Sequence, residues 1–233
     1  MKISVVIPTL NEEKYIDSML FHVKKLKPYE IIVADSLSKD KTRQIAKKYG
    51  AKVIMCPRKN AALGRNAGGR KARGDVILFL DADSIVFPNI LEVLEKDFKD
   101  KNIVGWTCSI YGFTPKWSEQ LLYNMSNQLI NFLTMRMKKP HAAGICIAVR
   151  RDIFNKLNGF NESLKVMEDH DFAQRTKKYG DFIFSKETCV FTSARRIENW
   201  GGLTLIKKYS KIYISFMLNK NKDYQNVEYE PIR

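Results

Sequence analysis

Two aspartates, Asp81 and Asp83, directly follow an apolar run at residues 76–80. In an open parallel sheet, ligands bind beyond the carboxyl ends of the strands, so polar residues just after a buried strand are the first candidates for chemistry. Two carboxylates at this spacing can hold a hard divalent cation and leave coordination positions for phosphates and water. The pair therefore predicts a metal site for a diphosphate, and the alternative is a turn with two solvated acids.

A basic stretch without an acid, residues 58–74, directly precedes this pair. Cations beside a metal site are expected where a polyphosphate bridges the two. Arg65 and Asn66, near the start of a predicted helix, are the candidates for contact with that ligand. The alternative is a solvated basic helix face, which we expect for most of the other cations in the stretch.

A second acidic cluster, Glu168-Asp169-His170-Asp171, lies just before an amphipathic helical pattern. The helix dipole keeps carboxylates of a first turn ionised, so one of them could act as a general base towards an attacking hydroxyl. Helix capping is the alternative, above all for Asp171. We expect His170 to orient a neighbour or to be exposed, because no second His or Cys lies at ligand spacing.

Polar residues also follow three other apolar runs. Pro8 to Glu12 follow the first run of the chain, and Asp35 follows the second. Arg195 and Arg196 come shortly after the last predicted strand and could clamp a diphosphate leaving group. An ordinary surface pair is the alternative for these two arginines.

The elements that must position these residues follow from the spacing of apolar side chains. Strand and helix patterns alternate over the first third of the chain, with strands expected at 3–7, 31–34, 53–55 and 76–80 and helices at 15–26, 41–49 and 61–73. Asn11 to Glu13 supply the predicted N-cap and first-turn acids of the first helix. Beyond residue 102 the pattern is mixed, with strands at 102–113, 145–149 and 189–192 and helices at 117–137, 169–179 and 203–218.

The composition is that of a globular protein with a core: 233 residues, 45% of them hydrophobic, with a net charge of +15. Because the strand at 76–80 is apolar on both faces, we expect an α/β fold in one domain, a Rossmann-like, mostly parallel sheet flanked by helices. Four cysteines far apart predict neither a zinc cluster nor a redox motif. With no signal peptide and no spanning apolar run, the sequence predicts a cytoplasmic protein with reduced thiols.

Taken in their order along the chain, these motifs resemble those of the inverting family 2 glycosyltransferases of GT-A fold, which use nucleotide diphosphate sugars. The resemblance covers residues 3–196, and its matching segments are 4–12, 32–42, 64–68, 74–75 with 81–83, 144, and 168–171 with 175. No single segment is decisive, but together and in register they are highly specific.

The resemblance implies that one group of residues binds the nucleotide sugar: Pro8, Thr9, Glu12, Asp35, Arg65, Asp81, Ala82, Arg195 and Arg196. Asp35 would face the base. Asp83, helped by Asp81, would bind Mn²⁺ or Mg²⁺ on the diphosphate. Arg195 or Arg196 would help the ion to stabilise the leaving phosphate.

On the acceptor side, the resemblance implies that Asp169 is the catalytic base, with Gly144 and Glu168 beside the acceptor. The deprotonated acceptor would attack the anomeric carbon from the face opposite the leaving nucleoside diphosphate, which inverts that carbon. The chain lacks the Gln-x-x-Arg-Trp sequence of the family's processive synthases. We therefore expect transfer of one sugar, from a UDP- or GDP-sugar, to a glycan, a small molecule or a lipid-linked acceptor.

The same resemblance divides the single domain, residues 1–233, into three parts. Residues 1–100 would bind the nucleotide sugar, 101–200 would bind the acceptor and carry catalysis, and 201–233 would form a basic helix and tail. Segments 117–135 and 200–222 are rich in apolar side chains, and the second carries lysines without an acid. They predict contact with an anionic membrane surface, peripheral on the inner face of the cell membrane, or else packing on the sheet or in a homodimer.

Two other functions compete with sugar transfer. A nucleotidyltransferase would use a similar diphosphate and metal site but release pyrophosphate. A basic nucleic-acid-binding protein would account for the net charge of +15, but it would leave the acidic pairs unexplained. We therefore expect no nucleic-acid partner.

Overall fold

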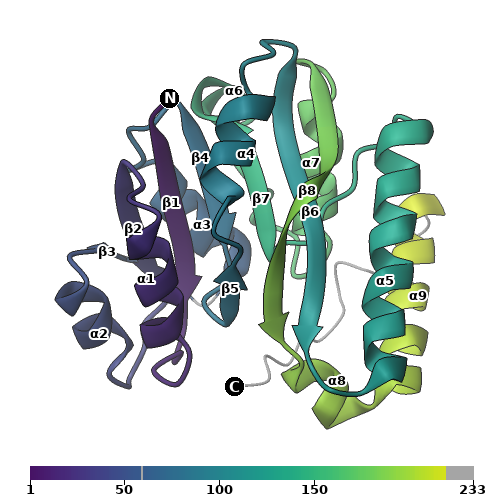
Figure 1. The fold of residues 1–233 in the computed structure, drawn as a ribbon, viewed down its shortest axis with the longest axis horizontal. Helices are drawn as coiled ribbons and strands as arrows, with labels where there is room; N and C mark the ends of the chain where they lie inside the picture. The colour runs from purple at the N-terminus through teal and green to yellow at the C-terminus, as the bar shows by residue number, and fades with distance from the viewer. Residues whose placement is uncertain (59, 219–233) are drawn as a thin grey trace.

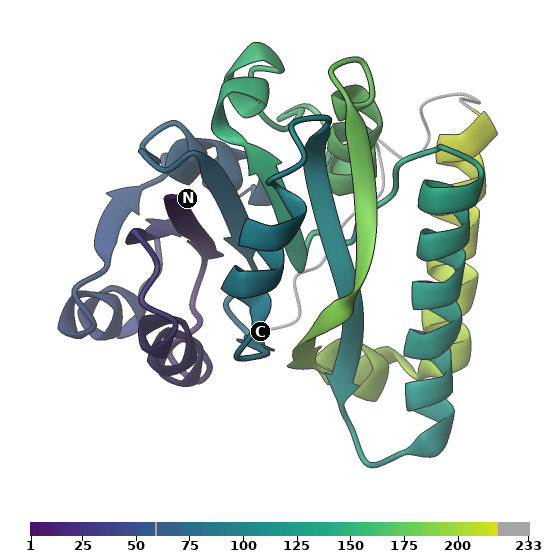
Figure 2. The same cartoon turned by 45° about the horizontal axis from the view of Figure 1, so that its top comes forward.

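The computed structural model of the chain describes residues 1–58 and 60–218. One sheet of eight strands runs through this part of the chain, with helices on both of its faces (Figure 1). Figure 2 shows two long helices standing side by side at one side of the molecule. The predicted tail, residues 219–233, lies outside the described residues.

The elements of the first half are β1 (Ile3–Thr9), α1 (Ile16–Lys25), β2 (Glu30–Asp35), α2 (Thr42–Lys48), β3 (Lys52–Met55), α3 (Ala61–Gly69), β4 (Val76–Leu80), β5 (Ser84–Val86) and α4 (Ile90–Asp97). Those of the second half are β6 (Ile103–Phe113), α5 (Trp117–Asn131), the π-helical turn η1 (Phe132–Arg136), β7 (Cys146–Arg150), α6 (Arg151–Lys156), α7 (Glu168–Thr176), β8 (Asp181–Ser193), α8 (Arg195–Trp200) and α9 (Gly202–Leu218).

The sheet joins a parallel part to a mixed part in the order β3-β2-β1-β4-β7-β6-β8-β5. The pairs β2/β3, β1/β2, β1/β4 and β6/β8 are parallel, whereas β4/β7, β6/β7 and β5/β8 are antiparallel. The predicted α/β fold is confirmed. Because β1, β2 and β4 run the same way, the residues that follow them meet at one edge of the sheet.

The central strand β4 separates two apolar layers. All five of its residues are buried, and alternation sends Leu78 into the layer under α1 and α4 and Phe79 into the layer under α3, α6 and α7. Phe154, Phe160 and Phe172 pack in the second layer. Since β4 also pairs with β7, the predicted donor and acceptor parts share one sheet, and both contribute side chains to each apolar layer.

Several boundaries differ from the sequence prediction. Asn11 does not cap the first helix, because its backbone is left-handed, with φ 55°, and its N–H donates to Ser38 Oγ. The helix α3 ends at Gly69 rather than at residue 73, because the chain must turn before Gly74 packs against the backbone of β1. The Gly74 N–H donates to Ser4 Oγ at 2.8 Å. The strand β8 is also far longer than predicted, and α4, α6 and α8 were not expected.

All four cysteines are free thiols, and Cys108 and Cys146 lie with their sulfurs 3.8 Å apart in the core. Among residues 1–58 and 60–218, no helix combines the length and apolarity that crossing a membrane requires.

The close packing of α3 on β1 gives a stability prediction. A Cβ on Gly68 would collide with Val6 Cγ1, so Gly68→Ala is expected to lower the free energy of unfolding by about 2 kcal/mol. Val6→Ala removes the colliding methyl group, so the double variant should cost less than the sum of the single variants, by about 1 kcal/mol. Denaturant unfolding of the four proteins measures this coupling, and strict additivity would contradict the predicted contact.

Candidate active site

A buried guanidinium, that of Arg65, joins three parts of the fold. Its Nη1 donates to Glu168 Oε1 at 2.9 Å, and its Nη2 donates to Asp81 Oδ1 and to the Gly144 carbonyl, both at 3.0 Å. Burial by itself would lower the pKa of Arg65, but the charges of Asp81 and Glu168 outweigh it, so the pKa lies above its ordinary value. The helix α3 thereby ties the end of β4 to the start of α7.

Asp169 lies beside this guanidinium in the first turn of α7. Its Oδ2 accepts the Gly144 N–H at 2.6 Å, and its Oδ1 accepts the His170 N–H at 2.8 Å. A Cβ on Gly144 would lie 2.5 Å from Arg65 Nη2 and 3.3 Å from Asp169 Oδ2, so a larger residue would displace one of them. Burial, reinforced by the charge of Asp169, raises the pKa of Glu168. The cluster thus brings Arg65, Gly144, Glu168 and Asp169 together.

Asp83 lies in a second charged cluster with Glu12 and Arg195. The Arg195 guanidinium donates to both Glu12 carboxylate oxygens at 3.1 Å, and its Nη2 lies 3.1 Å from Asp83 Oδ2. The guanidinium also stacks over the Tyr15 ring, 5.2 Å from its centroid. Burial raises the pKa of Asp83 to about 6, and the neighbouring charge of Asp81 adds to this rise.

Thr9 and Asp35 meet at the ends of β1 and β2, where they are partners in the parallel register. The Thr9 hydroxyl donates to Asp35 Oδ1 at 3.3 Å, and the Ser38 N–H donates to Asp35 Oδ2 at 3.0 Å. Pro8 lies against α3, since a Cβ on Gly64 would be 3.2 Å from Pro8 Cβ. Asp35, which we expected to face the base of the nucleotide, is fully buried and closed to solvent in this structure.

Of three other sequence candidates, Asn66 lies differently from the expectation. Asn66 is fully buried, and its side-chain amide makes hydrogen bonds of 2.7 and 2.8 Å with the backbone of Phe160. Its side chain points away from that of Arg65, because successive helical side chains point in different directions. The prediction that Asn66 contacts the ligand is therefore wrong in this structure. Arg196 donates to the Tyr209 hydroxyl on α9 at 2.9 Å. Ala82 is buried in the core, which leaves its backbone for contact with a ligand.

One residue near Asp83 has no signal in the sequence. Tyr123 on α5 packs so tightly against Gly112 of β6 that no Cβ would fit there. Burial raises the pKa of Tyr123 to about 12, and the charge of Asp83 contributes to this rise. Only the packing of α5 on β6 brings this phenol near the acids, so no local pattern could have identified it.

Carboxylates outnumber cations across the two clusters, with Glu12, Asp81, Asp83, Glu168 and Asp169 against Arg65, Arg195 and the nearby Arg196. Within the described ranges, no three His, Cys, Asp or Glu side chains gather closely enough to hold a metal ion. A divalent ion at Asp81 and Asp83 would therefore take its other ligands from phosphates and water, as Mg²⁺ and Mn²⁺ do in phosphate sites. The surplus of negative charge and the raised pKa of Asp83 fit such an ion.

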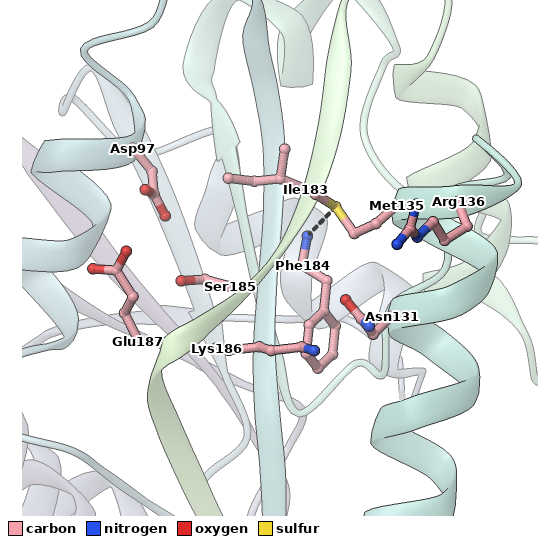
Figure 3. Close-up of a pocket in the computed structure, with 9 residues that line it drawn as sticks. All are labelled: Asp97, Asn131, Met135, Arg136, Ile183, Phe184, Ser185, Lys186 and Glu187. Atoms are coloured by element: carbon pink, nitrogen blue, oxygen red, sulfur yellow. Dashed lines mark hydrogen bonds between the residues drawn. The ribbon is translucent and has the colours of Figure 1, made fainter.

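A cavity of about 470 Å³ lies elsewhere, between α4, η1 and β8 (Figure 3). Figure 3 shows Asp97 and Glu187 on one side of β8 and Arg136 on the other, and the Phe184 N–H lies 3.3 Å from Met135 Sδ. None of the candidate residues above lines this cavity.

The family model described as Glycosyl transferase family 2 matches residues 4–157. The chain belongs to glycosyl transferase family 2. The match includes the predicted donor residues up to Asp83 and Gly144, and it ends before Asp169. The family predicted from the sequence is therefore confirmed.

Curated relatives of this family 2 chain include an uncharacterised glycosyltransferase of Rickettsia typhi, which is 25% identical over 236 residues, 94% of this chain and 73% of the relative. A shorter segment of 99 residues is 35% identical to the poly(ribitol-phosphate) β-N-acetylglucosaminyltransferase TarS of Staphylococcus aureus, covering 37% of this chain and 17% of TarS.

Solved structures share the fold. The crystal structure of S. aureus TarS residues 1–349 has a TM-score of 0.68 at 21% identity, over 88% of this chain and 66% of that one. The mannosyltransferase PcManGT from Pyrobaculum calidifontis, in complex with GDP-Man and Mn²⁺, has a TM-score of 0.65 at 18% identity, over 82% of this chain and 56% of that one. TarS has also been solved with UDP-GlcNAc. The predicted GT-A fold is confirmed, and this chain spans less than two thirds of the length of these solved chains.

The buried ion pairs of Arg65 give a second prediction. Arg65→Lys keeps the charge but cannot reach Asp81, Glu168 and the Gly144 carbonyl together, so the free energy of unfolding should fall by about 3 kcal/mol. The matched control is Arg70→Lys on the next turn, where one half-exposed ion pair with Glu162 is lost, at a cost below about 0.5 kcal/mol. Denaturant unfolding compares the two variants, and equal losses would contradict the central place of Arg65.

Proposed function

We propose that this chain transfers one sugar from a UDP- or GDP-sugar to an acceptor hydroxyl or phosphate, with inversion of the anomeric carbon. The observation that carries the proposal is the link through Arg65 and Gly144, which holds the first-turn Asp169 beside the carboxylate of Asp81. A base for the acceptor and a carboxylate pair for a diphosphate are the two charged parts that this displacement needs.

Asp169 is the proposed general base. Its two carboxylate oxygens accept backbone N–H groups, which fix the orientation of the carboxylate, and each oxygen has a further lone pair that can accept a proton. It would remove the proton from the acceptor hydroxyl as that oxygen attacks the anomeric carbon. The C–O bond to the nucleoside diphosphate then breaks on the opposite face, which gives inversion in a single displacement.

Asp83 and Asp81 are the proposed ligands of Mn²⁺ or Mg²⁺, in keeping with the Mn²⁺ of the PcManGT complex. When bound, the ion supplies positive charge to the leaving diphosphate. Arg195 lies 3.1 Å from Asp83 and would hold that carboxylate in place. The proposed nucleotide pocket is formed by Pro8, Thr9, Glu12 and Asp35, at the ends of β1 and β2.

Acceptor contacts are proposed for Gly144 and Glu168, which flank Asp169. Arg196 points towards α9 through its bond to Tyr209, so of the two arginines we assign the diphosphate side to Arg195. An acceptor on a glycan or a lipid carrier would meet the site on the side of α7, where Asp169 lies.

Replacing the proposed base tests the catalytic step. Asp169→Asn is expected to lower the transfer rate by at least about a hundredfold, because the amide cannot take up the acceptor proton. Nucleotide-sugar binding, measured by calorimetry, should stay within about twofold. Asp171→Asn is the matched control on the same helical turn, since its carboxylate bonds Arg175 at 2.8 Å instead. Full transfer by Asp169→Asn would remove Asp169 from this role.

Metal removal tests the donor side. A screen of UDP- and GDP-sugars with Mn²⁺, Mg²⁺ or EDTA is expected to show turnover with the ion and less than about a hundredth of it with EDTA or in Asp83→Ala. Asp152→Ala, an exposed acid on α6, is the control and should behave as wild type. The product should be a nucleoside diphosphate. Release of pyrophosphate would instead assign nucleotidyl transfer, and ion-independent turnover would overturn the metal site.

A further inference from the structure

The helix α5 has its polar and apolar sides reversed relative to a helix that packs on a sheet. Its side chains that face β6 include Glu119 and Asn127, which are 7% and 9% exposed. Asn127 exchanges two hydrogen bonds with the backbone of Ile110, at 2.9 and 3.0 Å, and Glu119 accepts the Thr114 hydroxyl at 2.6 Å. The inner side of α5 is therefore held by these polar contacts together with the packing of Tyr123 on Gly112.

The outer side of α5 is a continuous apolar stripe, formed by Trp117, Leu121, Met125, Leu129 and Phe132. These residues recur at about one helical turn, along roughly 22 Å of helix and its π-helical turn. Trp117 is 78% exposed and Met125 is 60% exposed, and the other three are about half exposed. Large apolar side chains gathered in this way mark an interaction surface, whereas single exposed ones do not.

The surroundings of this outer stripe are positively charged. The helix α9 stands beside α5 in both Figures 1 and 2, and it exposes Lys207, Lys208 and Lys211 together with Leu203 and Ile214. Residues 199–218 contain no acid, and the chain that follows the stripe continues with exposed cations at 136, 138 and 139.

The helix α5 exposes no negative charge beside these cations. Its one acid, Glu119, is buried and bonded to Thr114 and Lys116. Two copies of this chain meeting through α5 would bring cations towards cations. An anionic lipid surface instead offers both an apolar interior to the stripe and phosphate charge to the lysines. Charge complementarity therefore selects a bilayer over a second copy.

The stripe also starts at the end of the molecule that carries the candidate site. Trp117 and Leu203, each 78% exposed, open α5 and α9, and both helices begin next to α8 (Figure 1). The helix α8 carries Arg195, which lies 3.1 Å from Asp83. A surface that held Trp117 would therefore lie near the donor site.

We propose that α5, with the lysines of α9, docks on the surface of an anionic bilayer through the outer stripe. The stripe inserts its apolar side chains at the level of the headgroups, and the lysines pair with lipid phosphates. The docking itself stands without the sugar-transfer proposal. Resting on that proposed function, the docked orientation brings Asp169 and the donor to an acceptor carried by a lipid.

Vesicle binding tests the docking. Wild-type protein should co-sediment with vesicles of phosphatidylcholine and phosphatidylglycerol, and far less with phosphatidylcholine alone. Trp117→Gln combined with Met125→Gln should lower the partition coefficient by at least about tenfold. Lys207→Gln combined with Lys211→Gln should also lower it about tenfold at low salt. The matched control is Phe21→Gln on α1, which removes a side chain that is 45% exposed and should change nothing.

Four outcomes would overturn the docking. In the first, the wild type does not bind anionic vesicles, and in the second it binds neutral and anionic vesicles equally. In the third, the Trp117 and Met125 double variant binds vesicles as well as the wild type. In the fourth, light scattering shows a dimer that this double variant abolishes. The last would assign the stripe to a second copy. Nucleotide-sugar binding is measured on the same samples, and all variants should retain it. Vesicle binding without donor binding would contradict the proposed function alone, and donor binding without vesicle binding would contradict the docking alone.

Discussion

The buried guanidinium of Arg65 is the interaction on which the arrangement of the site depends. A charge removed from water is stable only where partners surround it, and Arg65 finds them at the end of β4, before β7 and at the start of α7. These three segments are far apart in the chain. Their shared partner fixes where Asp169 lies relative to Asp81, so one ion-pair cluster sets both the packing of α3 and the geometry proposed for catalysis.

The charges of the two clusters also support the proposed binding of a cation. Arg65 and Arg195 offset part of the negative charge, yet the pKa of Asp83 lies at about 6 and that of Glu168 is raised. Burial is the larger cause in both, and a neighbouring aspartate adds to it. A donor diphosphate alone would worsen this repulsion. Diphosphate and divalent ion together would relieve it, which couples the proposed binding of one to that of the other.

Local sequence patterns could predict the strand ends but not the partners of the side chains there. The buried run of β4 and the alternation of the first third predicted β1, β2 and β4 as strands, and hence that Thr9, Asp35 and Asp81 lie at or just after strand ends. Asn66 was different, because it lies one residue from Arg65 and helical geometry turns its side chain into the core, where it bonds Phe160. Tyr123 depends on the packing of α5 on β6, which no local period encodes.

The helix α5 shows a further limit of reading periodicity. A 3.6-residue repeat identifies the apolar side of a helix, and this side usually faces the core. That inference fails for α5, because Asn127 and Glu119 on the opposite side bond the backbone of Ile110 and the hydroxyl of Thr114. Polar contacts to β6 then decide the orientation, and the apolar side is left outward. The large apolar side chains on the outer side of α5 are therefore exposed rather than packed in the core, and the acid-free stretch of α9 beside them supports the proposed anionic partner.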